Sequence, residues 1–188
     1  MKQAQTLTDA DIKRALAYCS VRRHKTRDRT IIQMSILAGL RAKELAALRV
    51  SGVYDEAGAV REQFTIQAEQ TKGTNARTVY VSHKLRRVLS TYHQLIRHRP
   101  KHEPLFRTQM HTAFSANTMC QLLLNIYKAC GLPNATSHSG RRTFITRLAE
   151  KGINVRLLAE LAGHRHISTT QRYIDVNPEQ LARAVELV

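Results

Sequence analysis

Two segments of the chain place arginine beside residues that can start a helix. Arg41 ends the run Gly-Leu-Arg at 39–41, directly after an apolar segment, where its guanidinium can point into a cleft. His138 and Arg141 are three residues apart, so at a helix start both project to one side. An imidazole and a guanidinium at the positive end of a helix dipole make a site for an anion. Taken singly, Arg41 also fits a surface or capping arginine, His138 a helix cap, and Arg141 an ordinary helix surface.

Two further segments carry a lysine and a tyrosine. Lys72 opens the turn-forming run Lys-Gly-Thr-Asn, where its ammonium can reach into a groove and donate a proton. Gly-His at 163–164 ends an apolar helical pattern, and Tyr173 follows His164 by nine residues. Taken singly, Lys72 is typical of a solvated turn and Tyr173 of a buried structural tyrosine.

The elements that must position these residues are mostly helices. Thr8 and Asp11 predict a capped helix start, and the periodicity changes to that of strands only between residues 53 and 81, where 63–81 reads as a hairpin. Helices are predicted at about 8–20, 28–38, 40–48, 83–98, 115–130, 139–151, 154–162 and 168–174, with a last one after Asn-Pro-Glu at 177–179. The basic stretch at 22–25 is expected to be a loop. Near the other end of the chain, Ser168 is expected to cap the predicted helix 168–174. The fold class is therefore mainly α with a small antiparallel β-sheet (α+β).

Charge is the strongest global signal. Thirty Lys and Arg against 14 Asp and Glu give a net charge of +16 among 188 residues, and such an excess favours a polyanionic partner. No apolar run is long enough for a membrane span, so no membrane partner is expected. The three cysteines lack metal-ligand spacing and are expected to be reduced core thiols; no metal and no cofactor is predicted.

Together the four segments resemble the catalytic domain of the tyrosine recombinases, the phage integrase family. The resemblance is carried by Gly-Leu-Arg-x-x-Glu-Leu at 39–45, Lys72, His-x-x-Arg at 138–141, and Gly-His with Tyr173 nine residues on. It spans about residues 7–176 and implies the tyrosine recombinase catalytic-domain fold. Six catalytic residues follow from it: Arg41, Lys72, His138, Arg141, His164 and Tyr173.

The resemblance also implies a role for each residue. Arg41 and Arg141 would clamp the scissile phosphate, and Tyr173 would attack it to leave a 3′-phosphotyrosyl bond. His138 would be the general base and Lys72 the general acid. His164 would hydrogen-bond the phosphate and pack beneath the tyrosine, with Glu44 as a support for the site. Four residues are expected to contact DNA because of their neighbourhood: Arg77, Arg142, Arg165 and His166.

The implied function is site-specific recombination of double-stranded DNA: integration, excision, inversion or resolution. The alternative is a DNA-binding accessory protein that regulates or activates a partner recombinase. A homotetramer on DNA, or assembly with a partner recombinase, is expected, in the cytoplasm at the nucleoid of a prokaryote or its phage. The energy of the phosphodiester is kept in the phosphotyrosine, so no nucleotide cofactor is needed.

The chain also departs from the family pattern. Gly140 stands where leucine is more common, and the glycine is interpreted as the loss of one core contact. Residues 1–188 are expected to be one catalytic domain with a flexible N-terminus at 1–6 and without the N-terminal domain that usually helps to encircle DNA. The helix expected at 177–188 either docks into a neighbouring protomer or folds back onto its own domain.

Overall fold

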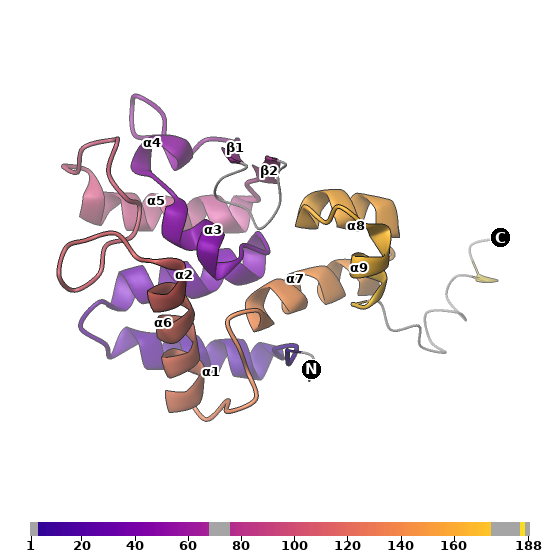
Figure 1. Cartoon of the computed structure of the whole chain (residues 1–188). Helices are drawn as coiled ribbons and strands as arrows, with labels where there is room; N and C mark the ends of the chain where they lie inside the picture. Colours follow the sequence, from indigo (N-terminus) through magenta and orange to yellow (C-terminus); the bar gives the residue numbers. More distant parts are fainter. Residues whose placement is uncertain (1–3, 68–75, 174–184, 187–188) are drawn as a thin grey trace. The chain divides into compact units, whose positions relative to one another are not determined.

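The computed structural model describes residues 4–67, 76–173 and 185–186 of the chain (Figure 1). It is mainly helical with one small sheet, as the sequence predicts. The chain divides into two compact units, Met1–Phe144 and Ile145–Val188, with the division inside helix α7. The elements in chain order are α1 (Asp9–Ser20), α2 (Lys25–Leu37), α3 (Ala42–Ala47), α4 (Val50–Val53), β1 (Gln63–Ile66), β2 (Arg77–Tyr80), α5 (His83–Ile96), α6 (Ala116–Ala129), α7 (Ser139–Glu150), α8 (Val155–Ala162) and α9 (Ile167–Gln171).

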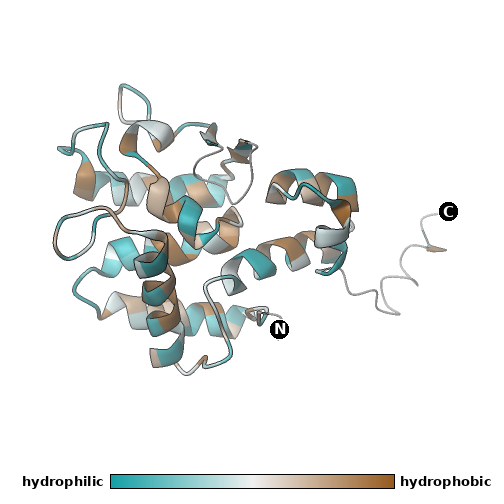
Figure 2. Ribbon diagram, in the orientation of Figure 1, coloured by the Kyte–Doolittle hydropathy of each residue, from teal (hydrophilic) through white to brown (hydrophobic). Residues whose placement is uncertain are grey.

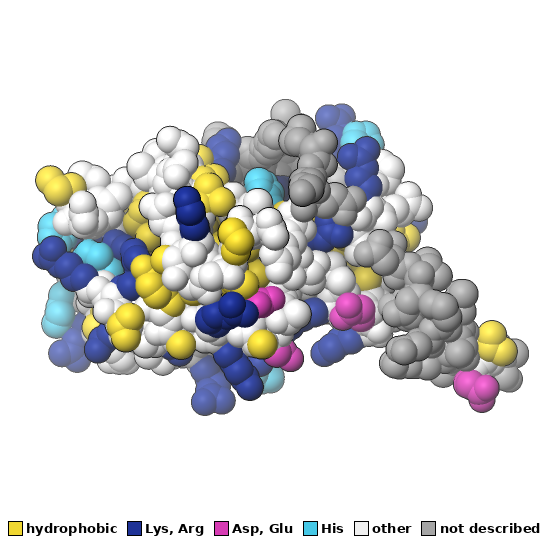
Figure 3. Space-filling model, turned by 90° about the horizontal axis from the view of Figure 1, so that it is seen from below, with side chains coloured by type: hydrophobic (Ala, Val, Ile, Leu, Met, Phe, Trp, Pro, Cys, Tyr) yellow, Lys and Arg dark blue, Asp and Glu magenta, His cyan; other side chains and the backbone are white. Residues whose placement is uncertain are grey.

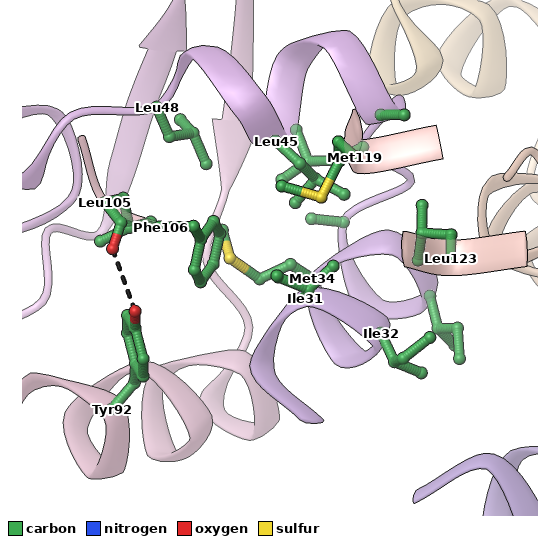
Figure 4. Close-up of a cluster of buried hydrophobic side chains, with 14 of the residues drawn as sticks. Ile31, Ile32, Met34, Leu45, Leu48, Tyr92, Leu105, Phe106, Met119 and Leu123 are labelled. Atoms are coloured by element: carbon green, nitrogen blue, oxygen red, sulfur yellow. Dashed lines mark hydrogen bonds between the residues drawn. The ribbon is translucent and has the colours of Figure 1, made fainter. Parts of the chain in front are cut away.

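Helix α2 organises the first unit because it packs against α1, α3 and α5. Its residues Ile31, Ile32 and Met34 are fully buried, and they meet apolar side chains from α3, α5, α6 and the segment before α6 (Figure 4). Helix α5 is apolar on one face only, as its alternating colours indicate (Figure 2). Burial of these apolar surfaces is the main force that holds the unit together.

The hairpin predicted at 63–81 is confirmed by the antiparallel pairing of β1 with β2. Phe64 pairs with Val79, and both side chains are buried. Arg77 pairs with Ile66 and lies on the same inward face of β2 as Val79. The residues between the two strands, 68–75, lie outside the described part of the chain, and Lys72 is among them.

Local capping explains where several helices begin and end. Thr8 accepts a hydrogen bond from the Asp11 backbone N–H and the Asp11 carboxylate accepts one from the Thr8 N–H, so the predicted helix start is confirmed. Gly163 ends α8 with a positive φ of 62°, which a glycine adopts without strain.

Three local predictions need correction. The basic stretch at 22–25 is only partly a loop, because α2 begins at Lys25. Val53 ends the short helix α4 and is not in a strand, while Tyr54 makes only an isolated bridge to Val60. Helix α9 is preceded by His166 as its N-cap, so the expected capping role of Ser168 is wrong.

The second unit contains the rest of α7 followed by α8 and α9, which pack on each other. The Asn154 side chain caps α8 by accepting a hydrogen bond from the Leu157 N–H. The predicted helix at 177–188 falls almost entirely outside the described residues, so it stays a prediction, as does the one-domain organisation. Among the described helices, none has the length and apolarity that crossing a bilayer requires.

Candidate active site

Arg41 lies directly before α3 and is fixed to that helix by a carboxylate. Its backbone N–H donates to Glu44 Oε2 at 2.9 Å, and its Nη1 donates to Glu44 Oε1 at 2.7 Å. The Glu44 side chain is fully buried, whereas that of Arg41 is 22% exposed. The guanidinium is thus held from its buried side and still reaches the surface.

Arg77 holds the same carboxylate from the sheet. Its Nη2 donates to Glu44 Oε2 at 2.9 Å, and its side chain is 5% exposed. Burial alone would raise the pKa of Glu44, but the charge of Arg77, the backbone N–H of Arg41 and the charge of Arg41 together lower it. Glu44 is therefore ionised and joins the two arginines at neutral pH.

Arg141, on α7, contacts the turn at Gly39, just before Arg41. Its Nη1 donates to the carbonyl oxygen of Gly39 at 2.8 Å, and the residue is 2% exposed. Gly39 has a φ of +62°, and a Cβ there would lie 2.6 Å from Phe144 Cδ1. A glycine is required both by this left-handed backbone and by the close approach of Phe144. The Gly39 turn thus brings Arg41, Glu44, Arg77 and Arg141 into one cluster, which we call the arginine cluster.

His138 lies at the start of α7, where its carbonyl accepts the first helical hydrogen bond from the Arg142 N–H. Its backbone N–H donates to Thr136 Oγ1 at 3.2 Å, and its ring Nδ1 lies 3.4 Å from Ser137 Oγ. The Ser139 hydroxyl caps the turn by accepting from the Thr136 N–H. The side chain of His138 is exposed, so it is accessible to a substrate.

The second unit holds the histidine and the tyrosine. The rings of His164 and Tyr173 stack with centroids 5.8 Å apart and planes 20° from parallel. His164 Nδ1 lies 2.8 Å from the hydroxyl of the buried Thr170, which orients the imidazole. The carbonyl of Tyr173 accepts a hydrogen bond of 3.5 Å from Thr146 on α7. Tyr173 is half-buried just beyond α9.

The four expected DNA contacts differ in their placement. Arg77 is buried against Glu44, so the structure gives it a supporting position inside the protein rather than one on a DNA-facing surface. The Nε of Arg142 donates to Thr6 Oγ1 at 3.1 Å, which draws its side chain toward the N-terminal segment. Arg165 and His166 are exposed. The link between Arg77 and Glu44 is the feature that sequence reasoning missed.

The interpretation of Gly140 as a lost core contact is wrong. A Cβ at this position would lie 2.1 Å from Ser35 Oγ and 2.8 Å from Ser35 Cβ. The start of α7 therefore approaches α2 so closely that no larger side chain fits without movement of the backbone.

One family of known proteins matches nearly the whole chain. The sequence profile described as "Phage integrase family" matches residues 5–180. The chain belongs to this family. It is 30% identical over 186 residues to the tyrosine recombinase XerA of Pyrococcus furiosus, covering 97% of this chain and 61% of that protein. The chain thus spans about three fifths of the length of that family member.

Solved structures of the family share the fold. The integrase of the Tn1549 transposon, in complex with transposon right end DNA, superposes with a TM-score of 0.77 at 19% identity, over 99% of this chain and 66% of that one. The catalytic domain of bacteriophage HP1 integrase superposes with a TM-score of 0.68 at 24% identity, over 98% of this chain and 95% of that one. This phage integrase family member therefore has the fold of an integrase catalytic domain.

Proposed function

We propose that this member of the phage integrase family is a site-specific DNA recombinase, which cleaves and rejoins double-stranded DNA through a 3′-phosphotyrosyl intermediate on Tyr173. The arginine cluster is the observation that carries the proposal. It collects three guanidinium charges against the single carboxylate of Glu44, which leaves an excess of positive charge for an anionic group. Guanidinium groups match phosphate oxygens in shape and charge.

In the proposed reaction, Arg41 and Arg141 bind the scissile phosphate and oppose the negative charge that grows in the transition state. Their contacts to Glu44 and Gly39 exist before DNA binds, so little reorganisation is required at the moment of reaction. The chemistry requires that Tyr173 reach the phosphate bound by these arginines.

The Tyr173 oxygen forms the new bond to phosphorus while the bond to the 5′-oxygen of the DNA breaks. The phenol proton of Tyr173 must leave as the new bond forms, and we assign its removal to His138. We assign the protonation of the departing 5′-oxygen to Lys72, which lies outside the described residues. His164 would hydrogen-bond the phosphate next to the tyrosine on which it stacks.

The partner we propose is double-stranded DNA; the structure of the Tn1549 integrase contains transposon right end DNA. We also propose that the chain acts in the cytoplasm at the nucleoid, as a tetramer on DNA or together with a partner recombinase. Arg142, Arg165 and His166 remain proposed DNA contacts. For Arg77 we propose instead that it positions Glu44, and through it Arg41.

The proposal is tested with a pool of nicked duplexes of randomised sequence, in which cleavage beside the nick releases a short fragment and traps the protein. Arg41→Lys and Arg141→Lys keep the charge but lose the planar fork. We expect each to lower the cleavage rate by ~10²–10³ with little change in DNA affinity. The matched control is Arg61→Lys, because Arg61 is exposed and lies outside the cluster. Wild-type cleavage rates in either cluster variant would contradict the proposal.

A further inference from the structure

A second group of cations lies between α2 and α5, away from the residues of the arginine cluster. Two neighbouring hollows of ≈ 390 and ≈ 310 Å³ are lined by these two helices, and both include Thr26. The second is also lined by residues that flank the helices and by Arg107, Thr108 and His111. We call them together the α2–α5 groove. Among the residues that the structure describes, none that lines this groove is Asp or Glu, and none belongs to the arginine cluster.

Four cations of this groove are available to a partner. Arg23, Lys25, Lys84 and Arg87 are exposed, and within the described part of the chain none of them makes an ion pair. Several other cations of the groove have internal partners. Arg27 pairs with Asp28 at 2.8 Å, and Arg107 pairs with Glu103.

These four cations form two pairs at opposite ends of the groove. Lys84 and Arg87 lie in the first half of α5, whereas Lys25 begins α2 and Arg23 lies in the turn just before it. The two helices run in opposite directions (Figure 1). Lys, Arg and His side chains also gather where α2 begins and α5 ends, at the left of the view from below (Figure 3). A helix of this length extends ~20 Å, so the groove presents cations over a distance rather than at one point.

A regularly charged, extended polyanion fits this arrangement better than a compact anion. Duplex DNA carries one negative charge per ~1.7 Å of its axis, so both pairs of cations can find phosphates on the same duplex. Gln33 and Thr26 add an amide and a hydroxyl on the groove wall, which can bond to phosphate oxygens. We infer that the α2–α5 groove is a second binding surface for the phosphate backbone of duplex DNA. The inference rests on the proposed function for the identity of the partner.

The test uses two pairs of charge reversals, Lys84→Glu with Arg87→Glu and Arg23→Glu with Lys25→Glu. The matched control is Lys13→Glu with Lys128→Glu, which changes the net charge equally at exposed positions on α1 and α6. Affinity for a random-sequence 30-base-pair duplex is measured by fluorescence anisotropy over a range of salt concentrations. Circular dichroism and thermal melting show whether each variant is folded.

Each groove variant should bind the duplex at least about tenfold more weakly than the control, and the slope of log affinity against log salt should fall by about two, one for each lost phosphate contact. Equal losses in the groove and control variants would overturn the inference, as would displacement of the duplex by polyglutamate at an equal concentration of charge. Cleavage of the nicked pool is measured in parallel. If the wild-type protein does not cleave but the groove variants still lose more affinity than the control, the proposed function is contradicted and the inference about the groove is not.

Discussion

Glu44 is the residue on which the arrangement of the arginine cluster depends. A carboxylate that is fully buried costs a large desolvation free energy unless charged partners compensate it. Arg41 and Arg77 supply that compensation from two different elements. The contact of Arg41 therefore serves folding as well as the proposed chemistry. Arg77 is buried, and its contacts with Glu44 and with the Gly39 carbonyl give it a supporting role.

Removing Arg77 tests this supporting role. We expect Arg77→Met to lower the free energy of unfolding by ~3–5 kcal/mol, because it leaves a buried carboxylate with one partner fewer. Adding Glu44→Gln to this variant should cost less than it does in the wild type, since the two residues are coupled. Urea denaturation of the two single variants and the double variant measures this coupling; additive free energies would contradict it.

The pH dependence of stability gives an independent readout of the same pair. In the wild type the pKa of Glu44 is lowered by folding. Its ionised form therefore stabilises the fold fully at pH values above the usual glutamate pKa of ~4.3. This contribution is lost as the pH falls through the pKa of Glu44 in the folded protein. Without Arg77 the pKa of Glu44 rises, and the gain in stability from low pH to neutral pH should be flatter. An unchanged pH profile in Arg77→Met would show that the pair is not coupled.

At the scale of elements, the close approach of α7 to α2 at Gly140 places Arg141 beside the Gly39 turn. The Thr143 hydroxyl, one turn further on, accepts from the Leu7 N–H at 2.9 Å and so fixes this part of α7 to the segment before α1. The position of the arginine thus depends on backbone packing as well as on its own hydrogen bond.

Substitution of Gly140 tests this packing. We expect Gly140→Ala to destabilise the fold by ~1–3 kcal/mol, because its Cβ would overlap with the Ser35 side chain. Ser35→Gly should relieve part of the added cost when the two changes are combined, because it removes the overlapping side-chain atoms but not the Ser35 backbone carbon, which would lie 3.1 Å from the new Cβ. Gly52→Ala is the control, since no atom lies within 4 Å of a Cβ there, and it should be neutral or slightly stabilising. Equal thermal stability of Gly140→Ala and Gly52→Ala would contradict the account.

The sequence predicted some of these features and not others, for physical reasons. The positions of Arg41 and Arg141 were predictable because local helix starts and motif spacing determine them. Arg77 was expected to contact DNA, although its inward direction could have been predicted, because it shares the two-residue period of the buried Val79. The constraint on Gly140 was not encoded locally, since Ser35 is distant in the sequence and becomes its neighbour only in the folded chain.

At the scale of the whole molecule, a net charge of +16 destabilises the folded chain by self-repulsion, and a polyanionic partner would offset this repulsion. Part of the excess is in the arginine cluster and part along the α2–α5 groove, which divides the cations between a proposed chemical role and a proposed binding role. The two units carry different parts of the proposed chemistry. The arginines and His138 belong to Met1–Phe144, and His164 and Tyr173 to Ile145–Val188.

The most direct test of the account is to identify the amino acid that becomes joined to DNA. The protein is incubated with the pool of nicked duplexes, denatured and digested, and the peptide that carries the nucleotide is sequenced by mass spectrometry. The account predicts a covalent adduct on Tyr173 in the wild type and no adduct in Tyr173→Phe. An adduct on another residue, or one that persists in Tyr173→Phe, would contradict it.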